Sequence, residues 1–370
     1  MMEVRLPEVC NIQYGFAFDS AKFSATTGTP LIRIRDVVRG YSETYTTENY
    51  NDEYLVNDDD LLIGMDGEFN IARWNGGPAL LNQRVCRLLP KGDIDKGYLF
   101  YFMPQALKQI EDRTPFVTVK HLSAKQLNSI TIPLPTLEIQ QRIACVLDKL
   151  THLISLCKQQ LAKLDELVKA RFVEMFGGIE ETVPLSHYIS ALLAGKSLAG
   201  EEECANKVLK TGAATYDEFD PSQVKNLPAD YIPQTDHLLR TGDVIISRMN
   251  TAELVGAAAY VWEAPINTYL PDRLWRAELK NNVCPIFVWQ SLIQATTKES
   301  IRKIASGTSG SMKNISKPGL LRIHVKKVGF DIQEKFSDFV AQVYRQKLTI
   351  QQSLDKLEVL KKALMQEYFG

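Results

Sequence analysis

Apolar residues recur with helical spacing over two long segments of the chain, at about residues 138–176 and 332–369. In the first segment they follow one another at steps of three, four or five positions, and in the second at steps of three, four or seven. Charged and amide residues fill the other faces. This near-heptad pattern predicts two amphipathic helices, each on the order of 55 Å long at about 1.5 Å per residue. Because a single helix cannot bury such a stripe, we expect the two to pack against each other, against partner proteins, or both. The predicted core of this coiled coil consists of Leu150, Leu161, Leu164, Val343, Leu354 and Leu357.

The two helical segments are copies of each other. When the chain is shifted by 193 residues, residues 117–177 fall on residues 310–370 without a gap, and 16 of the 61 positions are identical. Unrelated chains of average composition would agree at roughly 6% of positions. The identical positions include Lys120 with Lys313, and a terminal Phe-Gly pair closes both copies. The chain therefore contains an internal repeat.

The repeat continues upstream with gaps. The run Asp-Leu-Leu-Ile at 60–63 resembles Asp-Val-Ile-Ile at 243–246, and residues 83–87 resemble residues 272–276. Two globular segments therefore alternate with two helices along the chain. The predicted segments are residues 1–135, 136–178, 179–330 and 331–370.

Both globular segments mix short β-rich runs with turn residues. Strands are predicted at about residues 31–35, 60–64 and 243–247, and short helices at about 97–110 and 285–305. The order of these elements indicates an α+β fold for each segment and does not suit a doubly wound sheet. We therefore predict two globular domains of mixed helix and sheet that are separated by two long helices.

Composition is ordinary for a globular protein, with 45% hydrophobic and 24% charged residues. No apolar run approaches the roughly 18 residues that a membrane span needs, and the first residues do not resemble a signal peptide. We therefore expect a cytoplasmic protein. The formal net charge of −1 argues mildly against DNA binding through a bulk positive field. Residues 298–327 nevertheless hold eight basic residues and one acid, which could be a binding patch or only a solvated face.

The sequence shows no catalytic or metal-binding motif. Its Gly-Lys-Ser at 195–197 lacks the earlier glycine of a P-loop, because Ser190 stands there. The acids at 58–60 and 66–68 suit turns better than a nuclease site, and no base stands beside a nucleophile. The six cysteines and five histidines are scattered, so neither a disulfide framework nor a zinc site is expected. We expect no catalytic residue, no metal and no cofactor on this chain.

The first helix begins with a proline-rich exit followed by paired glutamines, Ile-Pro-Leu-Pro-Thr-Leu-Glu-Ile-Gln-Gln-Arg-Ile-Ala at 132–144. The second helix contains Phe-Ser-Asp-Phe-Val at 336–340 and ends Leu-Met-Gln-Glu-Tyr-Phe-Gly at 364–370. Together these features resemble the specificity subunits of type I restriction-modification systems, whose order of recognition domain, helix, recognition domain and helix spans the whole chain. The segment before the second helix, at 325–330, departs from the pattern because it lacks the prolines.

The resemblance implies a function and a set of partners. Each globular segment would be a target-recognition domain that reads one half of a split, asymmetric site in double-stranded DNA. The two helices would pack antiparallel as a spacer, and the pseudo-twofold repeat would dock two methyltransferase subunits and, through them, restriction subunits. S-adenosylmethionine, ATP and magnesium would bind those partner subunits and not this chain.

Candidate DNA contacts are polar residues near predicted strand ends and turns, because Arg and Lys suit guanine edges and phosphates, and Asn and Gln suit adenine. The loop at 73–77 could instead be a hairpin tip with a packed tryptophan, and the loop at 306–311 could be idle. The shared lysines could be a structural copy facing solvent. The candidates in the first domain are Arg33, Arg35, Arg73, Asn75, Gln83, Arg84 and Lys120. Those in the second are Lys210, Arg248, Asn250, Arg273, Ser311, Lys313 and Lys317.

Two alternatives from other classes remain open at this point. A structural or adaptor protein could carry globular heads on a coiled-coil stalk without any DNA role, which the net charge near zero would suit. A fragment of a fused methyltransferase-nuclease is also conceivable, although the clean terminal repeat argues against it.

Overall fold

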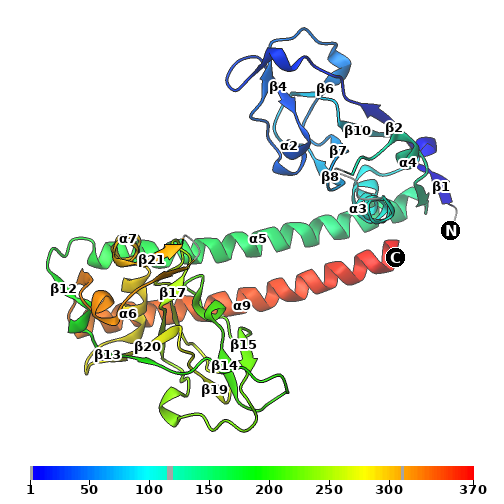
Figure 1. Ribbon diagram of the computed structural model, residues 1–370. Helices are drawn as coiled ribbons and strands as arrows, with labels where there is room; N and C mark the ends of the chain where they lie inside the picture. The colour runs from blue at the N-terminus through cyan, green and yellow to red at the C-terminus, as the bar shows by residue number, and fades with distance from the viewer. Residues whose placement is uncertain (1–2, 115–119, 310–311) are drawn as a thin grey trace. The chain divides into compact units, whose positions relative to one another are not determined.

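The computed structural model describes residues 3–114, 120–309 and 312–370 (Figure 1). The chain divides into two compact units. The first unit comprises residues 1–159 and 351–370, and the second comprises residues 160–350. Each unit thus holds one globular segment and half of each long helix, and the predicted segment limits stay predictions.

The two predicted long helices are present. Helix α5 spans Leu137–Phe176 and helix α9 spans Phe330–Phe369, with 40 residues each. In the second unit Lys347 pairs with Asp165 at 2.6 Å, and Phe336 packs against Phe172 with ring centroids 5.6 Å apart. Residue numbers rise along one helix as they fall along the other, so the helices run antiparallel there.

The predicted coiled-coil positions divide into two groups. Leu150, Val343 and Leu354 are buried, and the other three leucines of the predicted core are half-buried. Their shared role as core of the coiled coil stays a prediction.

The first unit is built around a four-stranded antiparallel sheet in the order β2-β10-β7-β8. A two-stranded ladder, β1-β11, and a second sheet, β3-β5-β4-β9-β6, complete it. The strands are β1 (Glu3–Arg5), β2 (Cys10–Tyr14), β3 (Phe23–Ser24), β4 (Thr29–Ile32), β5 (Tyr45–Thr46), β6 (Leu55–Val56), β7 (Leu61–Gly64), β8 (Asn70–Arg73), β9 (Ala79–Leu81), β10 (Val85–Pro90) and β11 (Thr131–Pro133).

The second unit repeats this plan with the four-stranded sheet β13-β20-β16-β18 and the ladder β12-β23. Two three-stranded sheets, β15-β14-β19 and β17-β22-β21, accompany them. The strands are β12 (Thr182–Pro184), β13 (Ile189–Ala194), β14 (Lys207–Leu209), β15 (Val224–Asn226), β16 (Val244–Ser247), β17 (Met249–Asn250), β18 (Ala258–Tyr260), β19 (Thr268–Tyr269), β20 (Leu274–Leu279), β21 (Ser306–Ser309), β22 (Met312–Asn314) and β23 (His324–Lys326).

Short helices connect the strands and cover the sheets. In the first unit these are α1 (Leu6–Val9), η1 (Ser20–Lys22), α2 (Ile34–Arg39), η2 (Asp52–Tyr54), α3 (Lys96–Arg113) and α4 (Ala124–Asn128). In the second unit they are η3 (Leu185–His187), η4 (Thr211–Ala214), η5 (Thr235–His237), α6 (Pro285–Leu292), α7 (Ala295–Ile304) and α8 (Lys317–Leu321).

Hydrogen bonds show that the two units are structural copies. The Leu6 N–H donates to the Ile130 carbonyl at 2.9 Å, and the Leu185 N–H donates to the Ile323 carbonyl at 2.8 Å. In both units one central strand lies between two antiparallel neighbours, β10 between β2 and β7 and β20 between β13 and β16. The α+β fold and the internal repeat are therefore confirmed.

Two local predictions were wrong. The strand expected at 31–35 ends at Ile32, because the Asp36 carboxylate accepts the Arg33 N–H at 2.9 Å and starts helix α2. The single helix expected at 285–305 is two helices, α6 and α7, which are separated at Ile293 and Gln294. The strands at 60–64 and 243–247 and the helix at 97–110 are present as β7, β16 and α3.

Candidate nucleic-acid interface

Three segments of the first unit meet just beyond the end of β7. The Met65 N–H donates to the Arg84 carbonyl at 2.9 Å, and the Met65 carbonyl accepts the Leu122 N–H at 2.7 Å. The next residue along, Asp66, forms an isolated antiparallel bridge with His121. We call this meeting point the first junction, formed by residues 65–67, 82–84 and 120–122.

The second unit builds the same junction from equivalent residues. The Arg248 N–H donates to the Arg273 carbonyl at 2.9 Å, and the Arg248 carbonyl accepts the Ile315 N–H at 3.1 Å. Met249 pairs with Asn314 in the place of Asp66 and His121. This second junction is formed by residues 248–250, 271–273 and 313–315, so both junctions gather residues that the sequence proposed as DNA contacts.

The side chains of the first junction form a charged cluster. His121 Nδ1 lies 2.5 Å from the Asp66 carboxylate. Arg84 Nη1 lies 3.1 Å from His121 Nδ1 and 3.3 Å from Nε2, and Arg84 Nε lies 3.7 Å from Asp66. The Arg84 side chain remains 51% exposed although it contacts both residues. The sequence predicts Arg84 as a DNA contact, but it predicts only a turn acid at Asp66 and an isolated histidine at His121.

The second junction is more basic and less tightly paired. Arg248 Nε donates to the Asn314 side-chain oxygen at 3.2 Å. Arg273 is exposed, and its guanidinium makes no hydrogen bond or ion pair with any residue that the structure describes. The Asn250 side-chain oxygen accepts the Thr251 N–H at 2.9 Å, which leaves its amide N–H groups to donate.

The shared lysines fasten neighbouring backbone in both units. Lys120 Nζ donates to the Glu111 carbonyl at 2.8 Å and lies 3.5 Å from the Glu111 carboxylate. Lys313 Nζ donates to the Gly307 carbonyl at 2.8 Å. Both lysines are half-buried and do not simply face solvent, and a DNA contact by either lysine stays a prediction.

A basic residue precedes a short helix at the same point of both units. Arg33 precedes α2 and Lys210 precedes η4, each directly after the strand that pairs in parallel, β4 or β14. Both side chains are exposed, and the Arg35 side chain is 55% exposed at 3.8 Å from Asp36. The repeat therefore places Arg33 and Lys210 in equivalent, solvent-facing positions.

The remaining sequence candidates are Gln83, Lys317, Ser311 and Asn75. Gln83, in the first junction, and Lys317, outside the second, are exposed, and Ser311 lies outside the described residues. Asn75 is exposed beside Trp74, which is buried and whose Nε1 donates to the Gly77 carbonyl at 2.6 Å. This loop therefore holds a packed tryptophan, as its structural alternative required.

Arg73 fastens the sheet of the first unit to helix α5. Its Nη1 lies 3.1 Å from the Asp148 carboxylate, and its guanidinium lies 4.7 Å from the centre of the Phe100 ring. The Tyr101 hydroxyl donates to Asp148 at 2.7 Å, and burial raises the pKa of Tyr101 to about 12, so the hydroxyl keeps its proton at neutral pH. We call this cluster the first joint; beside it lies a cavity of about 450 Å³. A DNA contact by Arg73 stays a prediction.

The second unit uses aromatic rings at the equivalent place, which we call the second joint. The register of β16 with β18 puts Tyr260 where the first unit has Arg73. The Tyr260 ring lies 4.6 Å from Trp262, and Trp262 stacks on Tyr344 of helix α9 with centroids 3.8 Å apart and planes within 6°.

Both long helices begin with a buried glutamine that the repeat shares. Gln140 accepts the Asp95 N–H at 2.8 Å and donates to the carbonyls of Asp93 and Pro135. Gln333 accepts the Cys284 N–H at 3.1 Å and donates to the Val328 carbonyl at 2.8 Å. The shared Ile-Gln of the sequence thus ties each helix to the start of α3 or α6.

A second repeated network stabilises the sheets. Arg87 donates to the Asp60 carboxylate and the Leu55 carbonyl, both at 2.9 Å. Arg276 donates to the Leu238 carbonyl at 2.9 Å and lies 3.6 Å from Asp243. Burial raises the pKa of Asp243. These arginines are enclosed by their partners, so we exclude them from the candidate interface.

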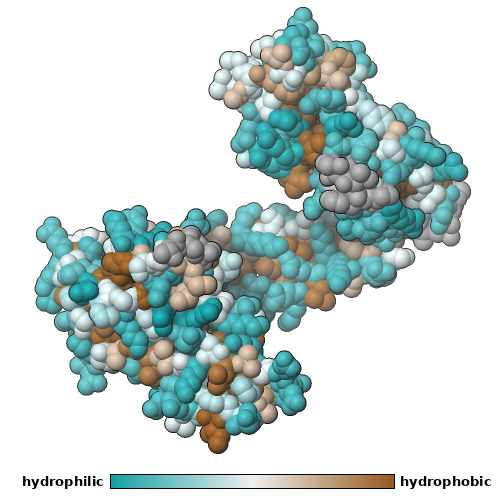
Figure 2. All heavy atoms as spheres, in the orientation of Figure 1, coloured by the Kyte–Doolittle hydropathy of each residue, from teal (hydrophilic) through white to brown (hydrophobic). Residues whose placement is uncertain are grey.

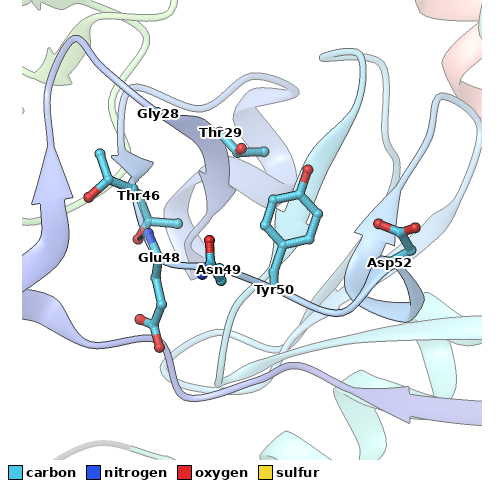
Figure 3. A pocket seen from close by; sticks show the side chains of 8 residues that line it. Gly28, Thr29, Thr46, Glu48, Asn49, Tyr50 and Asp52 are labelled. Atoms are coloured by element: carbon cyan, nitrogen blue, oxygen red, sulfur yellow. Dashed lines mark hydrogen bonds between the residues drawn. The ribbon is translucent and has the colours of Figure 1, made fainter.

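A cavity of about 410 Å³ lies in the first unit, beside the loop that follows β5 (Figure 3). Hydroxyl, amide and carboxyl groups line it, from Thr46, Glu48, Asn49, Tyr50 and Asp52. One Glu48 oxygen accepts the Asp19 N–H at 2.7 Å. With two carboxylates this lining suits N–H donors better than phosphate, and none of these residues is a candidate from the sequence.

The visible surface is mainly hydrophilic, with isolated apolar residues (Figure 2). Within residues 3–114, 120–309 and 312–370 no cluster of three or more His, Cys, Asp or Glu side chains could hold a metal ion. In the same residues no helix is long and apolar enough to cross a bilayer.

Comparison with known proteins finds a family match over the first part of the chain. Residues 1–166 match the family model of the type I restriction modification DNA specificity domain. The EcoBI specificity subunit of Escherichia coli is 40% identical over 170 residues, which cover 45% of this chain and 36% of that protein. The chain thus spans about a third of the length of this relative.

Two solved structures share the fold over the whole chain. One is a type I restriction-modification S subunit from M. genitalium, with a TM-score of 0.67 and 14% identity over 96% of its length. The other is a chain from a structural study of complex assembly and conformational transition of the type I R-M system. Its TM-score is 0.54, with 16% identity over 97% of its length. Both likenesses concern the fold alone.

Proposed function

Since residues 1–166 match the family model of the type I restriction modification DNA specificity domain, we propose that this chain is the specificity subunit of a type I restriction-modification complex. Each unit reads one half of a bipartite site in double-stranded DNA. Because the side chains at the two junctions differ, the two half-sites differ in sequence.

One observation carries this proposal. The first and second junctions have the same backbone hydrogen bonds, and each presents an exposed arginine, Arg84 or Arg273. Met65 and Arg248 make the same pair of backbone hydrogen bonds, yet their side chains and those around them are different. A shared frame with variable polar side chains is what two readers of different base sequences need. A structural or adaptor protein has no need for exposed arginines at both of these points.

The two long helices set the separation between the half-sites. Half-site spacing in two-headed DNA readers is geometric, at about one helical turn of roughly 34 Å or a multiple. A helix pair has a fixed rise of about 1.5 Å per residue, so it is suited to act as a spacer.

The partners follow from the same proposal. The duplicated helix starts, each tied by Gln140 or Gln333, offer two equivalent surfaces, so two methyltransferase subunits bind one chain, and restriction subunits join through them. The chain itself is non-catalytic. S-adenosylmethionine, ATP and magnesium belong to the partner subunits, and the complex acts in the cytoplasm, where its DNA is.

Sequencing of methylated bases tests the proposal directly. Cells that express the methyltransferase subunits with this chain should carry methylated adenines in one bipartite motif, and cells without the chain should lack that motif. Native mass spectrometry of the purified complex should show two methyltransferase subunits for each chain. Methylation that is unchanged when the chain is removed would contradict the proposal.

A further inference from the structure

The first junction holds an arginine in a backbone conformation that arginine rarely adopts. Among the described residues five non-glycine positions have positive φ, and four of them are Asp or Asn, which tolerate it well. The fifth is Arg84, with φ of 71° in the turn that the Val85 N–H closes onto the Asn82 carbonyl. Glycine would fit this turn without strain, so the arginine side chain is present at a cost in stability.

The Arg84 guanidinium is also oriented. Asp66 lies against Nε and His121 against Nη1, so two side chains hold the guanidinium from different sides. An arginine has five N–H donors, so the Nη2 group and the second Nη1 hydrogen remain available. The Arg84 side chain is 51% exposed, so solvent reaches about half of it.

Orientation separates base reading from phosphate binding. A phosphate accepts hydrogen bonds from many directions, so a mobile cation serves it well. A guanine edge presents O6 and N7 in a fixed geometry that two N–H groups of one arginine match. A guanidinium held by two neighbouring side chains is therefore suited to a base edge.

The second unit provides a comparison inside the same chain. Arg273 is the equivalent of Arg84, but Met249 and Asn314 stand where the first unit has Asp66 and His121. Asn314 accepts its hydrogen bond from Arg248, and the Arg273 guanidinium has no partner among the described residues. Arg273 is also absent from the described positive-φ positions. It therefore lacks both the strain and the orientation of Arg84.

We propose that Arg84 reads a guanine in the half-site of the first unit, with Asp66 and His121 as positioning residues, and that its counterpart Arg273 contacts phosphate. This inference rests on the proposed function, and it adds the base and the residue that recognises it.

The test is selection from a pool of duplex DNA with random bases, bound by the full chain in complex with its methyltransferase subunits. The variants are Arg84→Gly and Arg84→Lys. Glycine suits φ of 71°, so Arg84→Gly should unfold at the same temperature as the wild type or higher. Both variants should lose the preference for guanine at one position of one half-site by roughly 5- to 150-fold.

Two further variants separate the roles. Asp66→Ala releases the guanidinium and removes a negative charge, so guanine preference should fall while binding to non-specific DNA holds or strengthens. Arg273→Ala should weaken binding to all sequences alike and lower the slope of log K against log salt by about one. Arg39→Lys is the control, because Arg39 also pairs with an acid, Glu43 at 2.6 Å, but lies outside the junction; its preferences should match the wild type.

The possible results distinguish failure of the proposed function from failure of the inference about Arg84. A wild-type complex without sequence preference would overturn the proposed function, and this inference with it. A selective wild type whose preference survives Arg84→Gly would overturn this inference alone. So would a change at an A·T pair, or a uniform loss with a lower salt slope in Arg84→Lys or Arg84→Gly.

Discussion

The two units fasten their sheets to the long helices with different chemistry at equivalent points. In the first unit Arg73 pairs with Asp148 of α5, and both side chains are about one-third or more exposed. In the second unit Tyr260 and Trp262 take that place, and Trp262 stacks on Tyr344 of α9. Since the backbone frames are copies, the contrast shows that the repeat conserves hydrogen-bond geometry while side chains at the joints are free to change. One joint is ionic and screened by salt, and the other is apolar.

Truncation of the aromatic core of the second unit should have the largest effect on the free energy of unfolding. Phe176 is fully buried against Phe172, Phe287 and Phe336, with centroids 4.8 to 5.4 Å away. Phe369, its counterpart in the first unit, is 8% exposed and lies 5.3 Å from Tyr98. Phe176→Ala should lower the free energy of unfolding of its unit by ~3–5 kcal/mol, and Phe369→Ala by less. Hydrogen exchange resolved for each unit measures both; a larger loss at Phe369 would break the comparison.

The buried glutamines should give intermediate effects. Gln140→Ala leaves the Asp95 N–H and two carbonyls without their partner, whereas Gln333→Ala affects one N–H and one carbonyl. Each should cost ~1–3 kcal/mol, with the greater loss at Gln140. Urea unfolding, monitored by hydrogen exchange of the amides in α3 and α6, would measure the two losses of stability. If both variants lost almost no stability, water would be replacing the hydrogen bonds of both glutamines, and the comparison would fail.

The joints should respond to salt in different ways. Asp148→Asn should destabilise the first unit by roughly 0.5–1 kcal/mol at low ionic strength, because the pair with Arg73 is partly exposed. The difference from wild type should fade near 1 M salt, where the Debye length is about 3 Å. Tyr344→Leu in the second unit should cost stability that does not fade with salt. A salt-independent effect of Asp148→Asn would show that packing of Arg73 on Phe100 dominates the first joint.

The long helices and the α+β class were predictable because each depends on patterns within short stretches of sequence, and the repeat because its two copies align without a gap. The 193-residue shift also aligned Lys120 with Lys313 correctly, as both occupy the same point of the two junctions. The strand expected at 31–35 failed for a local reason. Its β-branched residues favour a strand, but the Asp36 side chain caps the backbone and begins a helix instead.

The arrangement of the candidate site was less predictable. Arg84 and Arg273 were chosen from residue type and turn position, and the structure brings both to a junction. The partners of Arg84 were missed because Asp66 and His121 are 55 residues apart and only the fold joins them. The stacking of Trp262 on Tyr344 could not be predicted for the same reason, since only the fold brings the two rings together. A comparison of the two halves at matched positions could have shown that Asp66 and His121 become Met249 and Asn314.

The central claim is that each unit reads its own half-site, and a domain exchange tests it most directly. Residues 1–135 are replaced by the matching segment of a related specificity protein, while α5 and the second unit stay unchanged. Sequencing of methylated DNA from cells with the exchanged chain and the methyltransferase subunits gives the motif. The account predicts that one half-site changes to that of the donor, while the other half-site and the spacing are retained. A change in both half-sites, or in neither, from a folded and methylating complex would contradict it.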